Sequence, residues 1–131
     1  TLMRRVHSDI LPLLHAAATG ALDKAEIVWS GEAAATVVLA TRGYPGDYIK
    51  GSRIAGVDAA QRRPGVVVFH AGTEERDGVL RAVGGRALNV TATGANLDQA
   101  VHRAYAAVDD IDWPEGFWRT DIGRRAPRGR R

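Results

Sequence analysis

The feature that most constrains this chain is a short run of branched apolar residues that leads into glycines. Val66–Phe69 is followed by His70-Ala71-Gly72-Thr73, and Gly84-Gly85-Arg86 opens a second stretch of alternating residues. Short runs rich in valine and bounded by glycine are typical of buried β-strands. The sequence therefore predicts two strands approached through glycine-rich turns, and a fold that is built around a sheet.

The rest of the chain supplies further strands and amphipathic helices. The predicted helices are Thr1–Val6, Asp9–Thr19 and Asn96–Asp110, and the further predicted strands are Ala33–Thr41, Arg53–Val57, Gly78–Ala82, Ala87–Thr93 and Phe117–Ile122. Asn96, with Gln99 three residues on, is a typical helix start. We interpret Gly72–Asp77 as a polar turn, and Gly78–Ala82 and Ala87–Thr93 as the two arms of one hairpin. This order of elements predicts an α+β domain with a small, mainly antiparallel sheet and flanking helices.

The basic charge of the chain is concentrated at its C-terminal end. The 131 residues carry 18 Lys and Arg against 15 Asp and Glu, a net charge of +3. Five of those arginines and no acid lie in residues 124–131, so residues 1–123 are mildly acidic. We therefore expect residues 124–131 to form a disordered basic tail, and we expect no specific nucleic-acid binding. Because no apolar run approaches about 20 residues, we predict no membrane association.

The sequence lacks the signatures of a self-sufficient catalyst. There is no cysteine, which excludes a thiol nucleophile and a thiolate metal site. No serine stands in a G-x-S-x-G context, and there is no Walker-type phosphate loop. The four histidines do not have the spacing of metal ligands. We therefore predict no catalytic residue and no metal ligand within this chain.

Gly84-Gly85-Arg86 is the strongest candidate binding site. Glycine lets backbone N–H groups approach a ligand, and an arginine guanidinium offers a bidentate fork to an anion such as phosphate. The same residues can also form a simple hairpin turn whose arginine faces solvent. Lys50 is either a second cation of the site or a solvated loop residue. His70 and Thr73, at the end of a predicted strand, are either site residues or structural hydrogen-bonding partners.

Several ordered motifs resemble one family. They are Ser8-Asp9, Gly20-Ala21-Leu22, Ala40–Gly51, His70-Ala71-Gly72-Thr73, Gly84-Gly85-Arg86 and Arg119–Gly123. Over roughly Met3 to Ala126, the chain resembles the C-terminal portion of the phosphoribosylamine–glycine ligases (glycinamide ribonucleotide synthetases), which are ATP-grasp enzymes. It departs from that family at Arg81-Ala82-Val83, where relatives often carry a threonine before the paired glycines. This departure removes a hydroxyl that could contact substrate.

The resemblance implies a fold, a reaction and a set of partners. Residues 23–123 would form the half-barrel-like C-terminal domain of the ATP-grasp ligases, and residues 1–22 would be a helical segment continuing from a preceding ATP-grasp domain. The reaction would join glycine to 5-phosphoribosylamine in purine biosynthesis, giving glycinamide ribonucleotide, ADP and phosphate. ATP and Mg²⁺ or Mn²⁺ would be bound outside this chain. The enzyme would be cytoplasmic and monomeric, and this chain on its own would be inactive.

Within that reaction, the chain would help to bind the sugar phosphate and close the active site. The substrate-binding residues that the resemblance implies are Arg86, Gly84, Gly85, Lys50, His70 and Thr73. Arg86 and the N–H groups of the two glycines would hold the 5-phosphate, whereas His70 and Thr73 would lie near ribose hydroxyls.

Two other interpretations stay open at this point. One is a stand-alone, non-catalytic module that binds a sugar phosphate or a nucleotide, because the same motifs would suit it. The other is an RNA-associated protein that acts through its arginine-rich tail.

Overall fold

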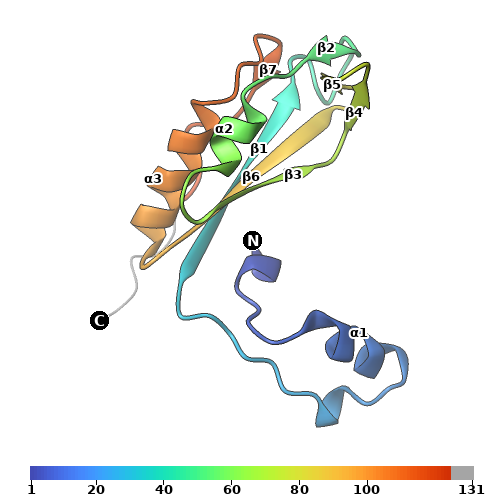
Figure 1. Cartoon of the computed structure of the whole chain (residues 1–131), viewed down its shortest axis with the longest axis vertical. Coiled ribbons are helices and arrows are strands. Elements are labelled where there is room, and N and C mark those ends of the chain that lie inside the picture. Colours follow the sequence, from blue (N-terminus) through green and yellow to red (C-terminus); the bar gives the residue numbers. More distant parts are fainter. Residues whose placement is uncertain (125–131) are drawn as a thin grey trace.

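The chain folds into an antiparallel four-stranded sheet backed by two helices, and a smaller three-stranded sheet. An N-terminal arm extends away from them (Figure 1) and contacts the larger sheet where the Thr1 and Thr36 hydroxyls are 2.7 Å apart. The structure is a computed structural model and describes residues 1–124. The predicted basic tail, 124–131, therefore lies outside the described residues except for Arg124. The helices are η1 (Leu2–Arg4), α1 (Ile10–Ala18), η2 (Leu22–Lys24), α2 (Val57–Gln61) and α3 (Leu97–Val108). The strands are β1 (Ala33–Thr41), β2 (Ser52–Arg53), β3 (Val66–His70), β4 (Thr73–Arg76), β5 (Val79–Ala82), β6 (Arg86–Gly94) and β7 (Gly116–Phe117).

Strand β6 is the centre of the larger sheet, whose order is β3-β6-β1-β7. It pairs antiparallel with β1 and with β3, so both of its edges are satisfied. Leu88, Val90 and Ala92 alternate along it and are fully buried, which confirms the period-2 pattern expected of this strand. Helices α2 and α3 lie over the same side of the sheet (Figure 1) and complete the core there.

The opposite side of the sheet is polar at its centre and partly open. Asn89 lies between Val38 of β1 and Phe69 of β3 in the strand register. Both of these neighbours are exposed, by 39% and 41% of their surface respectively. One residue pair further along β6, the hydroxyls of Thr36 and Thr91 are 2.8 Å apart. This side of the sheet leads toward the candidate site described below.

The predicted hairpin between Gly78–Ala82 and Ala87–Thr93 is wrong. Strand β5 pairs instead with β4, which occupies the segment interpreted as a polar turn, and with β2, giving a second sheet of order β2-β5-β4. The turn that joins β4 to β5 is Asp77-Gly78, and both residues have positive φ, as tight hairpin turns require. Gly84 and Gly85 therefore carry the chain from one sheet to the other.

Helix α3 begins as the sequence predicts, with Asn96 as its N-cap, and ends at Val108, two residues before the predicted Asp110. The Asn96 side chain accepts a hydrogen bond from the N–H of Gln99 at 2.8 Å, and the Gln99 side chain accepts one from the N–H of Ala95 at 2.8 Å. This reciprocal arrangement satisfies backbone donors that the first turn leaves free. On the buried face of α3, Ala104 and Val108 are fully enclosed.

The last strand is shorter than the predicted Phe117–Ile122. Strand β7 spans Gly116–Phe117 and pairs with the end of β1. Beyond it, the Tyr105 hydroxyl donates to the carbonyl oxygen of Arg119 at 2.7 Å and accepts from the N–H of Ile122 at 3.1 Å. Side-chain contacts from α3 therefore replace the sheet pairing that the sequence suggested.

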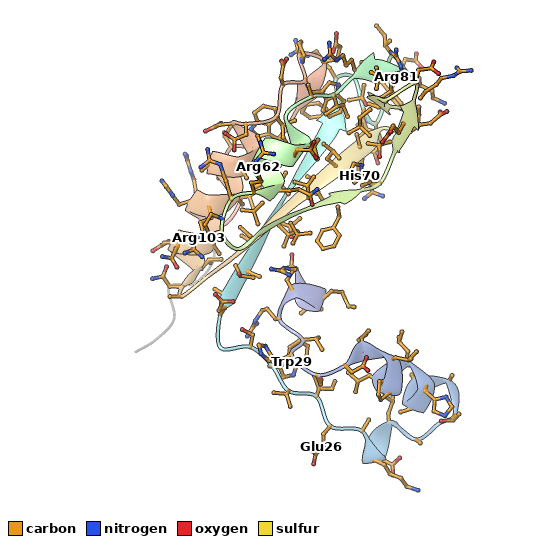
Figure 2. The ribbon with its side chains drawn as sticks, in the orientation of Figure 1. Glu26, Trp29, Arg62, His70, Arg81 and Arg103 are labelled. Carbon is orange, nitrogen blue, oxygen red and sulfur yellow. The ribbon has the colours of Figure 1, made fainter. Side chains whose placement is uncertain are left out.

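The N-terminal arm, residues 1–32, holds most of the exposed large apolar side chains. Eight of the twelve belong to it: Leu2, Met3, Leu11, Leu14, Leu22, Ile27, Val28 and Trp29. Within the arm, Asp9 caps α1 by accepting from the N–H of Leu11, and a single antiparallel bridge joins Val6 to Trp29. Figure 2 shows Glu26 and Trp29 on the extended run that returns toward the sheet. The predicted helices at Thr1–Val6 and Asp9–Thr19 correspond to η1 and α1.

Candidate functional site

A cavity of about 530 Å³ opens at the crossover between the two sheets. It is lined by Tyr44, Ala71, Gly72, Gly85, Arg86 and Asn89. This volume falls within the range of about 300–1,000 Å³ that is usual for small-molecule sites. Arg86 is the one charged residue among the six and its side chain is exposed, so the cavity favours an anion.

Glycine is required where the backbone segments cross. A Cβ atom on Gly72 would lie 2.7 Å from the Cα of Gly84, and one on Gly85 would overlap the ring of Tyr44. Thr41 ties the crossover to β1, because its N–H donates to the carbonyl of Gly85 at 2.8 Å and its hydroxyl donates to the carbonyl of Gly84 at 2.9 Å. The walls of the cavity are thus fixed by backbone contacts.

The two glycine N–H groups that the sequence pointed to are not equivalent. The N–H of Gly84 donates to the carbonyl of Gly72 at 3.0 Å and is therefore engaged within the fold. The N–H of Gly85 makes no backbone hydrogen bond within residues 1–124. Of the pair, Gly85 is the one whose donor is left for a ligand.

The histidine and threonine of the predicted site lie together, but beside a different cavity. The Nδ1 atom of His70 is 2.9 Å from the hydroxyl of Thr73. His70, at the end of β3 (Figure 2), lines a second cavity of about 370 Å³ with Arg53, Asp58 and Glu75 among its polar neighbours. His70 and Arg86 therefore line different cavities, although Ala71, which follows His70, lines the larger one with Arg86.

Lys50 lies in the loop between β1 and β2, where it is exposed. Neither of the two cavities includes it in its lining. No contact in the described part of the chain joins it to Arg86.

Sequence reasoning missed two residues of the larger cavity. Tyr44 lies within the motif Ala40–Gly51, where it was not singled out as a site residue, yet its ring forms a wall beside Gly85. Asn89 lies within the predicted strand Ala87–Thr93, but no motif marked it as a site residue. No local signal could have found it, because residues three apart on a regular strand point to opposite faces of the sheet.

Two ion pairs perturb pKa values, and both serve the fold. Asp110 accepts two hydrogen bonds from Arg63, at the end of α2, which lowers the pKa of the Asp110 carboxyl and raises that of the guanidinium. Arg119 donates to Asp121 at 2.6 and 2.8 Å, with the same directions of shift. None of these four residues lines the larger cavity.

Within residues 1–124, no three His, Cys, Asp or Glu side chains are grouped so that they could hold a metal ion. Over the same part of the chain, no helix has the length and apolar character needed to cross a bilayer.

Comparisons with known proteins identify the family. The family model described as "Phosphoribosylglycinamide synthetase, C domain" matches residues 34–125. Proteins named phosphoribosylamine–glycine ligase are 56% identical over 125 residues in Mesorhizobium japonicum and 53% identical over 125 residues in Agrobacterium fabrum. The chloroplastic ligase of Arabidopsis thaliana is 50% identical over 129 residues, which is 97% of this chain and 24% of that protein.

The chain spans under a third of these relatives. Each bacterial match covers 95% of this chain and 29% of the relative. A solved structure of phosphoribosylamine–glycine ligase from Thermotoga maritima superimposes with a TM-score of 0.65 at 28% identity, covering 82% of this chain and 27% of that one. This likeness confirms the small antiparallel sheets with few flanking helices. The chain belongs to the phosphoribosylglycinamide synthetase C-domain family.

Proposed function

We propose that this chain is the C-terminal portion of an ATP-dependent ligase that joins glycine to 5-phosphoribosylamine, and that it binds the sugar phosphate. The observation that carries the proposal is the cavity at the sheet crossover, which brings Arg86 beside the free N–H of Gly85. A guanidinium and a backbone N–H are the donors that phosphate oxygens accept best. The names of the relatives support the reaction.

The contribution of this chain is binding and orientation. The residues described here include no group of metal ligands, so ATP and Mg²⁺ would be held by the rest of the protein. Fixing the phosphate at Arg86 would hold the reacting amine in place and keep water out as the domains meet. The chain therefore acts without an acid–base group of its own.

The other predicted site residues have secondary roles in this proposal. His70, whose Nδ1 atom is 2.9 Å from the Thr73 hydroxyl, lines the second cavity and would meet polar groups of the substrate or of the facing domain. Gly84 supports the site through its bond to Gly72. Lys50 is exposed and lines neither cavity, so it would contribute a cation only when the neighbouring domain or the substrate approaches its loop.

The arm is the part of the chain that would meet the ATP-grasp domain. Its exposed apolar residues, among them Leu11, Leu14 and Trp29, are costly in water and are covered when a neighbouring domain packs on them. In this division, residues 1–22 continue from the ATP-grasp domain, residues 23–123 form the C-terminal domain and residues 124–131 form a basic tail. The substrates would be small molecules, and the enzyme a cytoplasmic monomer.

The first test is kinetic. In the polypeptide encoded by the complete reading frame, Arg86→Ala should raise KM for phosphoribosylamine far more than KM for glycine or ATP. Arg62→Ala is a matched control, because Arg62 is exposed at the end of α2 (Figure 2) and lines neither cavity. Equal effects on all three substrates, or none, would contradict the assignment of Arg86.

A second test separates the ligase from a binding module. The DNA upstream of the Thr1 codon should continue in frame into an ATP-grasp sequence. A start codon directly before Thr1 would favour the non-catalytic sugar-phosphate or nucleotide module instead. The 131-residue chain alone should show no ATP-dependent ligation, and turnover by pure chain would contradict the view that the nucleotide site lies elsewhere.

A further inference from the structure

A β-bulge brings two side chains to the same cavity that regular pairing would keep apart. The register between β1 and β6 runs from Val38↔Asn89 to Leu39↔Leu88 and then steps to Ala40↔Arg86, so one residue of β6 is left without a partner. In an unbroken strand, residues three apart point to opposite faces of the sheet. The extra residue reverses that alternation, and Arg86 and Asn89 both line the larger cavity.

The Asn89 amide is placed for a ligand and has no task in the core. The core on the other side of the sheet is closed by its strand neighbours Leu88 and Val90, which are fully buried. Asn89 itself is half-buried, and its flanking partners Val38 and Phe69 offer only apolar groups. No side-chain hydrogen bond within residues 1–124 uses the Asn89 amide. Its donors and its acceptor are thus free to bind something in the cavity.

The spacing of these two groups suits a furanose phosphate. Three residues of strand span at most about 10 Å, and the bulge shortens that distance, so both side chains can reach a single pentose 5-phosphate. The Asn89 amide carries one acceptor oxygen and two N–H donors, and a sugar hydroxyl both donates and accepts. An amide next to an arginine site can therefore read the hydroxyls of a sugar whose phosphate the arginine holds.

We propose that Asn89 is a specificity-determining residue that hydrogen-bonds the ribose hydroxyls, and that the bulge in β6 exists to aim it at the sugar while Arg86 holds the phosphate. The proposal rests on the proposed function, because it takes Arg86 as the phosphate site. Tyr44, whose ring lies against Gly85, also lines the cavity. Asn89 would then make the domain bind a sugar phosphate more tightly than inorganic phosphate.

The test measures binding by isothermal titration calorimetry, with the polypeptide of the complete reading frame. The probes are ribose 5-phosphate, 2-deoxyribose 5-phosphate and inorganic phosphate. Asn89→Leu should lower the affinity for ribose 5-phosphate by roughly three- to tenfold, which corresponds to about one hydrogen bond. The affinity for inorganic phosphate should be unchanged. The substitution should also reduce the difference in affinity between ribose 5-phosphate and 2-deoxyribose 5-phosphate. Asn89→Ala, which adds no bulk, should give the same pattern if the leucine variant does not fold.

Control variants distinguish the role of Asn89 from the proposed phosphate site at Arg86. Val38→Thr changes the strand partner of Asn89 on the same face without touching the cavity lining, and should leave all three affinities unchanged. Arg86→Gln should lower the affinity for all three probes. If both Asn89 variants bind ribose 5-phosphate normally while Arg86→Gln weakens it, the role of Asn89 is refuted and the phosphate site stands. If Arg86→Gln is also without effect, the site itself is refuted.

Discussion

Replacing Gly72 by alanine tests how tightly the two sheets are joined. The new Cβ would lie 2.7 Å from the Cα of Gly84 and 2.8 Å from the carbonyl oxygen of Arg86. Both atoms belong to the backbone, so the segments must separate by about half an ångström or more to reach ordinary contact. Side-chain rotation cannot relieve this overlap.

That separation would weaken three hydrogen bonds at once. The N–H of Gly72 donates to Arg86 at 2.9 Å, and its carbonyl accepts from Val83 at 2.8 Å and from Gly84 at 3.0 Å. Each backbone hydrogen bond contributes about 0.5–1.5 kcal/mol net. We therefore expect Gly72→Ala to lower the free energy of unfolding by about 2–4 kcal/mol, a large effect for one methyl group.

The assay is urea unfolding of the 131-residue chain, followed by tryptophan fluorescence, to which the buried Trp113 contributes together with Trp29 and Trp118. Gly31→Ala is the matched control, since a Cβ there meets nothing within 4 Å and Gly31 has no positive φ. It should be neutral or stabilising by up to about 1 kcal/mol. If Gly72→Ala and Gly31→Ala unfold at the same urea concentration with the same slope, the close approach described here is wrong.

Three further changes probe the fold around the site. Asn96→Ala removes the side-chain acceptor that caps α3 and should cost about 1 kcal/mol, seen as a lower thermal midpoint; an unchanged midpoint would show that the cap contributes nothing. Tyr105→Phe removes the hydroxyl that holds Arg119 and Ile122 and should speed amide hydrogen exchange at Ile122 while α3 stays protected, whereas unaltered exchange would refute its anchoring role. Arg63 lowers the native-state pKa of Asp110, so their pairing stabilises the fold above the unfolded-state pKa of about 3.9 and that contribution is lost as the pH falls through the lower native value. Asp110→Asn should therefore flatten the acid side of a stability–pH curve, and a variant curve that keeps the same shape would contradict the pairing.

Local sequence signals predicted the elements whose patterns are complete in themselves. The valine run of β3, the alternation of β6 and the Asn96 cap of α3 each encode one element within a few residues, and the structure confirms all three. The family motifs led to the correct fold and family because they extend over nearly the whole chain.

Pairing between distant segments was the part that local patterns did not encode. Thr73–Arg76 is a charged run that looks like a turn, yet it forms a strand because β5 offers it a partner. The candidate site could be predicted only in part, for the same reason. Arg86 is visible beside its glycines, but the contribution of Asn89 depends on a register step between strands far apart in sequence, and the wall formed by Tyr44 depends on how a loop folds back on Gly85.

The pairing of β1 with β6 also sets the order in which this domain can fold. Ala33 pairs with Gly94 and Ala40 with Phe117, so the chain must close very long loops before the larger sheet exists. The hairpin of β4 and β5 joins neighbours in sequence and can form early, within microseconds for a typical hairpin. Domains dominated by distant pairings fold on the scale of milliseconds to seconds. During that interval the edges of β6 are bare, and in a cell this is the period when the chain is most open to aggregation and to chaperones.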